Sequence, residues 1–156
     1  MYIFRNSLFL CGLTALLACV PTTDAGQKAS NERIARGMAI VETCRSAACR
    51  TLNLDGSALA DFTVLGEMPH VRSLMVSYTN LADLGDIAAM TQLEELHVGN
   101  AQFSDLSGLA NFPKLKVLHL QNASKVTDYA PIGRLSELEE LAVGTYYSTS
   151  LGFVSN

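Results

Sequence analysis

The sequence predicts an α/β solenoid in which parallel strands line the concave side of an arc, 3-10 or extended segments form the convex side, and a helix covers the N-terminal end. Three observations predict this fold class. From position 48 onward the chain divides into rows with a period of 22, one row being a single residue longer. Apolar residues recur at the same positions of each row. Upstream of the rows, apolar residues follow helical spacing.

The rows begin at positions 48, 70, 92, 114 and 137, and each opens with an L-x-x-L-x-L pattern, as in HVRSLMV and QLEELHV. Its three apolar columns are Cys49, Val71, Leu93, Leu115 and Leu138; Leu52, Leu74, Leu96, Leu118 and Leu141; and Leu54, Val76, Val98, Leu120 and Val143. No row can bury its apolar edge alone, so the rows must stack. Residues that alternate with these apolar positions are expected to face solvent.

This pattern resembles the leucine-rich repeats of the short class found in bacterial internalin-like proteins. The resemblance covers residues 48–154 and implies about five repeats over 48–156, the last one partial. The sequence departs from the family at the position usually given to Asn, which holds Ser57, Thr79, Ala101, Ala123 and Tyr146. The adjoining Asn100 and Asn122 are candidates to replace that asparagine ladder.

An aspartate column opens the second half of the first four rows, at Asp61, Asp83, Asp105 and Asp128. Asp favours turns because its carboxylate accepts hydrogen bonds from backbone N–H groups two or three residues further on. We therefore interpret the column as structural capping and not as a catalytic or calcium-binding site.

Residues 1–18 have the pattern of an export signal, with Arg5 before an apolar run from Leu8 to Ala18. The following stretch, Leu16-Leu17-Ala18-Cys19, resembles the lipobox of bacterial lipoproteins, which implies lipidation of Cys19. Residues 19–30 are then a lipidated tether, because they are small and polar without apolar periodicity. Plain secretion or an uncleaved anchor is the alternative for the signal, and a disordered N-terminus without a role is the alternative for the tether.

Residues 31–49 are expected to cap the solenoid, with Asn31 as the N-cap of a helix that carries Ile34, Met38 and Val41 on one face. Cys44 and Cys49 remain as an even pair once Cys11 leaves with the signal and Cys19 is acylated. In an oxidising compartment such a pair favours a disulfide. A metal site or a redox dithiol is the alternative, although the pair has neither CxxC spacing nor a neighbouring His.

Charge and motifs exclude several function classes. Without residues 1–18 the chain keeps ten basic and fifteen acidic residues, a net charge of −5, which argues against nucleic acid as a partner. The sequence contains no glycine-rich phosphate loop, G-x-S-x-G or H-E-x-x-H motif. We therefore expect neither an enzyme nor a cofactor.

His97 and His119 occupy one column of adjacent strands and are expected about 4.8 Å apart. Two imidazoles could share a metal, with a third ligand from Glu95, Glu140 or Asn100. Because nothing in the sequence fixes that geometry, we favour an exposed stacked pair without metal. A pH-sensitive contact surface is a further possibility.

The concave side carries the candidate binding site, because its exposed residues vary while the scaffold repeats. The candidate protein-binding residues are Met75, Tyr78, Glu95, His97, Asn100, Val117, His119 and Asn122. Their mixture of aromatic, Met and small polar side chains is typical of protein contacts. An alternative surface is the C-terminal edge around Tyr146, Tyr147 and Phe153, where no polar cap follows and the oligomeric state stays open.

The predicted function is that of a membrane-anchored protein-binding module of the bacterial cell envelope. The lipid anchor would hold the chain on the membrane, facing the periplasm and most simply at the outer membrane, where it binds an unidentified protein. The alternatives are an immunity-type lipoprotein that neutralises a periplasmic toxin, a structural envelope component, and a secreted or soluble periplasmic protein. These functions rest on analogy at the level of the fold.

Overall fold

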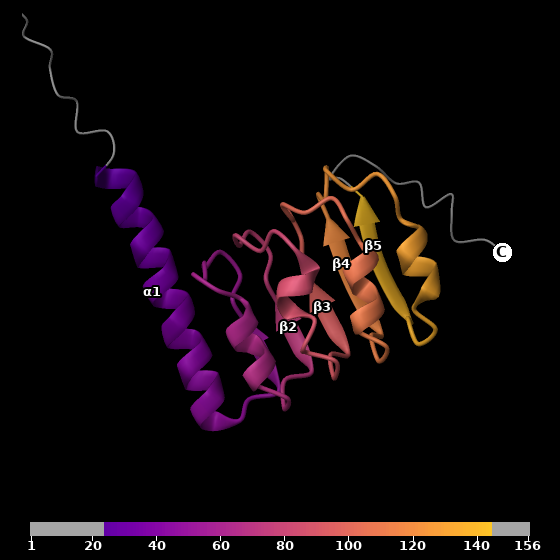
Figure 1. Cartoon of the computed structure of the whole chain (residues 1–156), viewed down its shortest axis with the longest axis horizontal. Coiled ribbons are helices and arrows are strands. Elements are labelled where there is room, and N and C mark those ends of the chain that lie inside the picture. The colour runs from indigo at the N-terminus through magenta and orange to yellow at the C-terminus, as the bar shows by residue number, and fades with distance from the viewer. Residues whose placement is uncertain (1–23, 145–156) are drawn as a thin grey trace, which may run out of the picture.

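The computed structural model describes residues 24–144, which form one long helix followed by a regular array of short strands and 3-10 helices (Figure 1). Helix α1 covers Asp24–Ala47. The strands are β1 (Thr51–Asn53), β2 (Ser73–Met75), β3 (Glu95–His97), β4 (Val117–Gln121) and β5 (Glu140–Gly144). All five are parallel and lie side by side in chain order, so the predicted solenoid is confirmed.

Four 3-10 helices form the opposite layer, one in each of the first four rows. They are η1 (Thr63–Glu67), η2 (Leu84–Ile87), η3 (Ser107–Asn111) and η4 (Ala130–Arg134). Figure 1 shows them stacked as one layer on the side of the array opposite the strands. Parallel strands need such crossover segments, because the chain must return to the same end of the sheet after each strand.

The strand register reproduces the rows of the sequence. Leu52 pairs with Leu74, Leu74 with Leu96, and Leu96 with Leu118, so that each pair is one row apart. Leu118 pairs with Leu141 because the fourth row is a single residue longer than the others. Equivalent residues of successive rows therefore stand next to one another in space.

The apolar columns form a single continuous core. Leu74, Leu96 and Leu118 each have 0% of their surface exposed, and Leu109 and Phe112 on the return segments are equally buried. Burial weakens toward the last strand, where Leu135, Leu138, Leu141 and Val143 are only partly buried. The core of the described residues is thus tightest in the middle rows and loosest at β5.

The aspartate column has the predicted structural role at the start of each return segment. Asp83 is the N-cap of η2, whereas Asp61, Asp105 and Asp128 each stand one residue before the N-cap of their 3-10 helix. The backbone N–H two residues further on donates to each carboxylate, at 2.8 Å for Asp61, 2.7 Å for Asp83, 2.7 Å for Asp105 and 2.9 Å for Asp128. The Thr63 hydroxyl and backbone N–H lower the pKa of Asp61, and the Ser107 backbone N–H and hydroxyl lower the pKa of Asp105. These carboxylates are occupied in structural hydrogen bonds.

The turn after each of the first four strands contains a residue in the left-handed region, at Gly56, Tyr78, Asn100 and Asn122 with φ of 67, 58, 57 and 58°. Gly and Asn accept this conformation at the lowest cost. Among the described residues, the side chains of Asn100 and Asn122 make no hydrogen bond to a neighbouring row, so the prediction that they replace an asparagine ladder is not supported. A link of that kind comes instead from Asn80, whose amide bonds both the N–H and the carbonyl of Leu59, 21 residues away.

Helix α1 begins at Asp24, ahead of the predicted N-cap, Asn31. Asn31 lies inside the helix, where its side-chain oxygen accepts a hydrogen bond from Gln27 at 3.1 Å. Ala, Gln and Lys at positions 25–29 favour helix, so propensity extends the cap into the segment expected as a tether. The side chains of residues 25–32 are all exposed, and this end of α1 projects beyond the array (Figure 1).

The second half of α1 covers the first row. Val41 and Cys44 are buried in the core. Gly37 packs directly against the backbone of Ala58, since a Cβ at position 37 would lie 2.2 Å from the carbonyl oxygen of Ala58.

Among residues 24–144, no helix combines the length and hydropathy that a membrane span requires.

Candidate protein-binding surface

The sheet exposes one face away from the 3-10 helices, which we call the concave face. It comprises Thr51, Asn53, Asp55, Ser73, Met75, Ser77, Glu95, His97, Gly99, Val117, His119, Gln121, Glu140, Ala142 and Gly144. These residues alternate with the buried leucines and valines, which places them on the opposite side of the strands.

The structure brings five of the predicted binding residues together at the centre of this face. Met75, His97 and His119 are successive register partners on β2, β3 and β4. Glu95 pairs with Val117 in the neighbouring column. The five side chains therefore form two adjacent columns across three strands.

The other three predicted binding residues lie in the left-handed turns after the strands, at the rim of the face. Tyr78 is the most exposed, with 60% of its surface accessible. Asn100 and Asn122 are half-buried. A strained left-handed conformation at a bulky residue such as Tyr78 costs stability, and such positions occur often at functional sites.

The rings of His97 and His119 lie side by side, as expected, with centroids 4.2 Å apart, but they are tilted by 57° and not stacked. Both residues are half-buried, whereas the sequence predicted an exposed pair. His119 Nε2 lies 2.8 Å from a carboxylate oxygen of Glu140. Burial lowers the pKa of His97 and the neighbouring His119 lowers it further, against the opposing effects of Glu95, Asp55 and Glu140. His97 therefore resists protonation more than a free imidazole does.

The pair has no third ligand in place. Within the described chain, no group of three or more His, Cys, Asp or Glu side chains is arranged to hold a metal ion. Glu95 accepts a hydrogen bond from the Ser73 hydroxyl at 2.7 Å, which draws its carboxylate toward β2. The arrangement suits a contact surface with both donors and acceptors.

Arg33 holds α1 against the turns at the rim, an interaction that sequence reasoning missed. Its guanidinium donates to the carbonyl oxygens of Gly56 and Ser57, both at 3.0 Å, and of Tyr78 at 2.7 Å. The three acceptors lie 23 to 45 residues away, so no local pattern could have indicated them. Arg33 thereby fixes the carbonyl of Tyr78.

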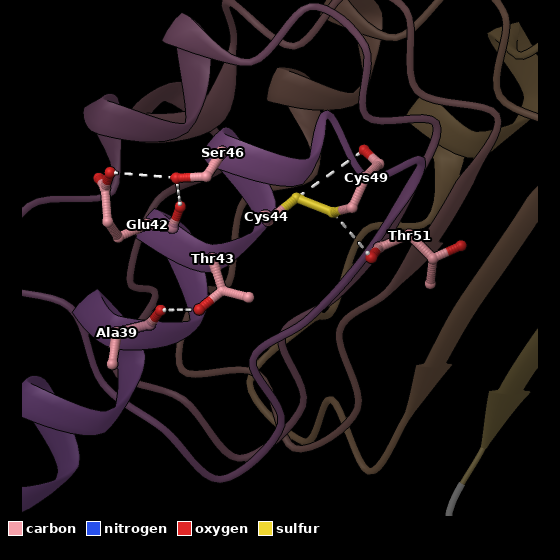
Figure 2. The surroundings of a disulfide bond; sticks show 7 residues. All are labelled: Ala39, Glu42, Thr43, Cys44, Ser46, Cys49 and Thr51. Atoms are coloured by element: carbon pink, nitrogen blue, oxygen red, sulfur yellow. Dashed lines mark hydrogen bonds between the residues drawn. A yellow bond between two sulfur atoms is a disulfide. The ribbon is translucent and has the colours of Figure 1, made fainter.

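An apolar groove lies between α1 and β1, at the edge of the concave face, with a volume of about 470 Å³. Ala39, Ile40 and Ala47 line it from α1, and Thr51, Leu52 and Asn53 line it from the strand. Five of its lining residues, Ala39, Thr43, Cys44, Cys49 and Thr51, are labelled in Figure 2, which is centred on the neighbouring disulfide. Small residues at positions 39, 43 and 47, one helical turn apart, are the signal that could have indicated this space.

The predicted pairing of Cys44 with Cys49 is confirmed, since the two sulfurs form a disulfide at a Cα–Cα distance of 4.9 Å (Figure 2). The bridge joins the last turns of α1 to Cys49, two positions before β1.

Several predicted features lie outside the described residues. They are the signal at 1–18, the lipidation site Cys19, and the C-terminal residues Tyr146, Tyr147 and Phe153.

No protein-family model matches the sequence, and no curated protein matches it. Among solved structures, internalin C2 of Listeria monocytogenes matches with a TM-score of 0.53 and 26% identity, over 59% of this chain and 40% of that one. This chain is a leucine-rich repeat solenoid. The match spans well under half of internalin C2, so it concerns the repeat array and not that whole protein.

Two other leucine-rich repeat structures match less well. A second Listeria internalin, inlF, is 19% identical, with a TM-score of 0.40 over 60% of this chain and 39% of that one. The ectodomain of the receptor kinase SOBIR1 from Arabidopsis thaliana is 16% identical, with a TM-score of 0.34 over 62% of this chain and 68% of that one.

Proposed function

We propose that this leucine-rich repeat chain is a protein-binding module that contacts its partner through the concave face. The observation that carries the proposal is the column formed by Met75, His97 and His119 on three adjacent strands, with the exposed Tyr78 at the rim of the face. Met and aromatic side chains are enriched in interface centres, and a rigid sheet needs little backbone ordering on binding. The fold supports the proposal, because stacked repeats form the extended concave surfaces that solenoid proteins use for binding.

The proposal extends to the site of action, where a lipid on Cys19 would anchor the chain to the bacterial cell envelope, facing the periplasm and at the outer membrane. Two observations support it. The stretch Leu16 to Cys19 has the pattern of a lipobox. The disulfide between Cys44 and Cys49 is typical of proteins in oxidising compartments. A secreted or soluble periplasmic form is the alternative.

The binding proposal is tested with a concave-face variant that combines Tyr78→Asn, His97→Ala and His119→Ala. Asn is chosen at position 78 because Asn100 and Asn122 hold the same left-handed conformation in the next rows. Tyr78 is exposed, so its change should shift the free energy of unfolding by less than about 0.5 kcal/mol, whereas His97 and His119 are half-buried and their changes require the melt as a check on folding. We expect a normal circular-dichroism melt together with weaker capture of partner proteins after cross-linking in envelopes.

A control variant changes Thr91, Ser104 and Arg134 to Ala, because all three are exposed outside the concave face. It should keep every partner of the parent chain. If the concave-face variant folds normally and also keeps every partner, the concave face is not the binding surface. A captured toxin would favour the immunity-type lipoprotein, and the absence of any partner would favour a structural envelope component.

The anchor is tested with Cys19→Ala. Loss of the acyl chains should move the protein from the membrane fraction to the soluble periplasm, or leave the precursor unprocessed. Fractionation of Cys44→Ala serves as a control for a cysteine change elsewhere. Unchanged membrane association of Cys19→Ala, with no acyl mass on the native N-terminus, would exclude the lipid anchor.

A further inference from the structure

The charges of the concave face are one-sided. Its residues include three carboxylates, at Asp55, Glu95 and Glu140, and no Lys or Arg. The basic residues Arg72 and Lys116 stand in the column that precedes the strands, where each lies 3.5 Å from a carboxylate of the next row, Glu94 and Glu139 respectively. The face itself therefore presents negative charge to a partner.

Each of these carboxylates keeps free acceptor capacity. Asp55 accepts one hydrogen bond from the backbone N–H of Ser77, at 2.7 Å. Glu95 accepts one from the Ser73 hydroxyl, and Glu140 lies beside His119 with 62% of its side chain exposed. An ionised carboxylate has about four lone-pair positions, so each can still accept bonds from a cationic group.

The groove between α1 and β1, at the end of the same face, is mainly apolar, with Arg36 as the one charged residue in its lining. Thr51 and Asn53 belong both to its lining and to the concave face, so the two surfaces are continuous. The small side chains of Ala39 and Ala47 leave room for a larger apolar group from outside. Its volume of about 470 Å³ exceeds that of any single side chain.

The dimensions of the sheet set the length of a segment that could reach both features. Adjacent strands lie about 4.8 Å apart, so the four intervals from β1 to β5 span about 19 Å. An extended chain advances about 3.3 Å per residue, so about six residues cross the sheet. One end of such a segment would lie at the groove and the other at Glu140.

We propose that the concave face binds an extended cationic polypeptide segment, which inserts a large apolar side chain into the groove between α1 and β1 and places Lys or Arg over Glu95 and Glu140. This inference rests on the proposed protein-binding function and names the chemistry of the partner. Charge complementarity selects the segment, and the apolar anchor fixes its register on the sheet.

The test selects ligands from a phage-displayed library of random peptides, about twelve residues long, on the immobilised full chain. Selected peptides should share one large apolar residue and one or two Lys or Arg about four to six positions away. Synthetic copies should bind more weakly as salt rises, because their charge contacts are exposed. Glu95→Gln with Glu140→Gln should weaken binding about tenfold, and Ala39→Leu, which fills the groove, should do the same.

The matched control is Glu32→Gln with Glu137→Gln, which removes two exposed carboxylates outside the concave face and should leave affinity unchanged. Acidic or neutral peptides, no enrichment at all, or equal affinity for the Glu95/Glu140 variant and its control would each overturn the proposed ligand class. If the Tyr78/His97/His119 variant also binds the peptides at full strength, the concave-face function fails as well. If the Tyr78/His97/His119 variant loses peptide binding while the Glu95/Glu140 variant keeps it, the concave face remains the binding surface and only the cationic ligand is rejected.

Discussion

His97 shows how a repeated position acquires individual chemistry. The register places it beside His119, and partial burial together with that neighbour lowers its pKa in the folded chain. No single row predicts this effect, because the neighbour belongs to the next row. The same column contains Asn53 and Ala142 in other rows, which do not titrate.

The lowered pKa of His97 links stability to pH. In the unfolded chain the imidazole takes up a proton near its ordinary value of 6.5, whereas the folded chain binds that proton only at lower pH. The unfolded state therefore binds more protons as pH falls through about 6.5 toward the folded pKa, and the free energy of unfolding decreases in this window.

Substitution of His97 by Gln should make that decrease smaller. The measurement is urea unfolding of the parent and of His97→Gln at several pH values between about 7 and 5. Parallel curves for the two proteins would show that His97 does not contribute to the pH dependence.

At the scale of single elements, α1 depends on contacts with the first row. Arg33 joins it to three carbonyl oxygens, Gly37 packs on Ala58, and the disulfide ties its last turns to β1. Its first turns have no such contacts, since residues 25–32 are exposed. The stabilising contacts of the helix therefore lie from Arg33 onward.

Removal of the disulfide by Cys44→Ala with Cys49→Ala should lower the free energy of unfolding by about 2 to 3 kcal/mol. The bridge closes a short loop, and loops of this size contribute about that much in the chain-entropy model. Urea unfolding with and without reductant measures the effect. The parent should lose stability on reduction while the double variant does not respond, and equal responses would contradict a bridge in the isolated protein.

The sequence predicts different elements with unequal accuracy, for physical reasons. The strands and the aspartate caps follow from columns that recur from row to row, so each repeat supports the others. The predicted start of α1 is wrong because helix propensity at positions 25–29 outweighs the capping signal at Asn31. Arg33 and the groove depend on how the helix docks on the array, which no periodicity encodes.

For the whole molecule, burial decreases along the array. Leu96 in the third row is fully buried, whereas Leu141 in the fifth row is only partly buried. Stability of a solenoid is roughly a sum of repeats and of the interfaces between neighbours. The third row has a neighbouring row on each side and so contributes two interfaces, whereas the fifth row contributes one within the described residues.

Leu96→Ala should therefore destabilise the chain by about 2 to 5 kcal/mol, the usual range for a buried Leu. Leu141→Ala removes the same atoms from a half-buried position and should cost less. Urea unfolding of the two variants compares them directly. Equal losses would show that the fifth row is covered as completely as the third.

The one-to-one strand register also determines which changes in length the chain can accept. A single inserted residue within a strand would turn its leucines to the solvent side, since side chains alternate along a strand. Duplication of one whole row, such as 92–113, would instead add one strand and one 3-10 helix in phase with their neighbours. Each such duplication would widen the concave face by about 4.8 Å and leave α1 and its disulfide on the first row undisturbed. Change by whole rows is therefore the route along which this architecture can lengthen its concave face while retaining its core.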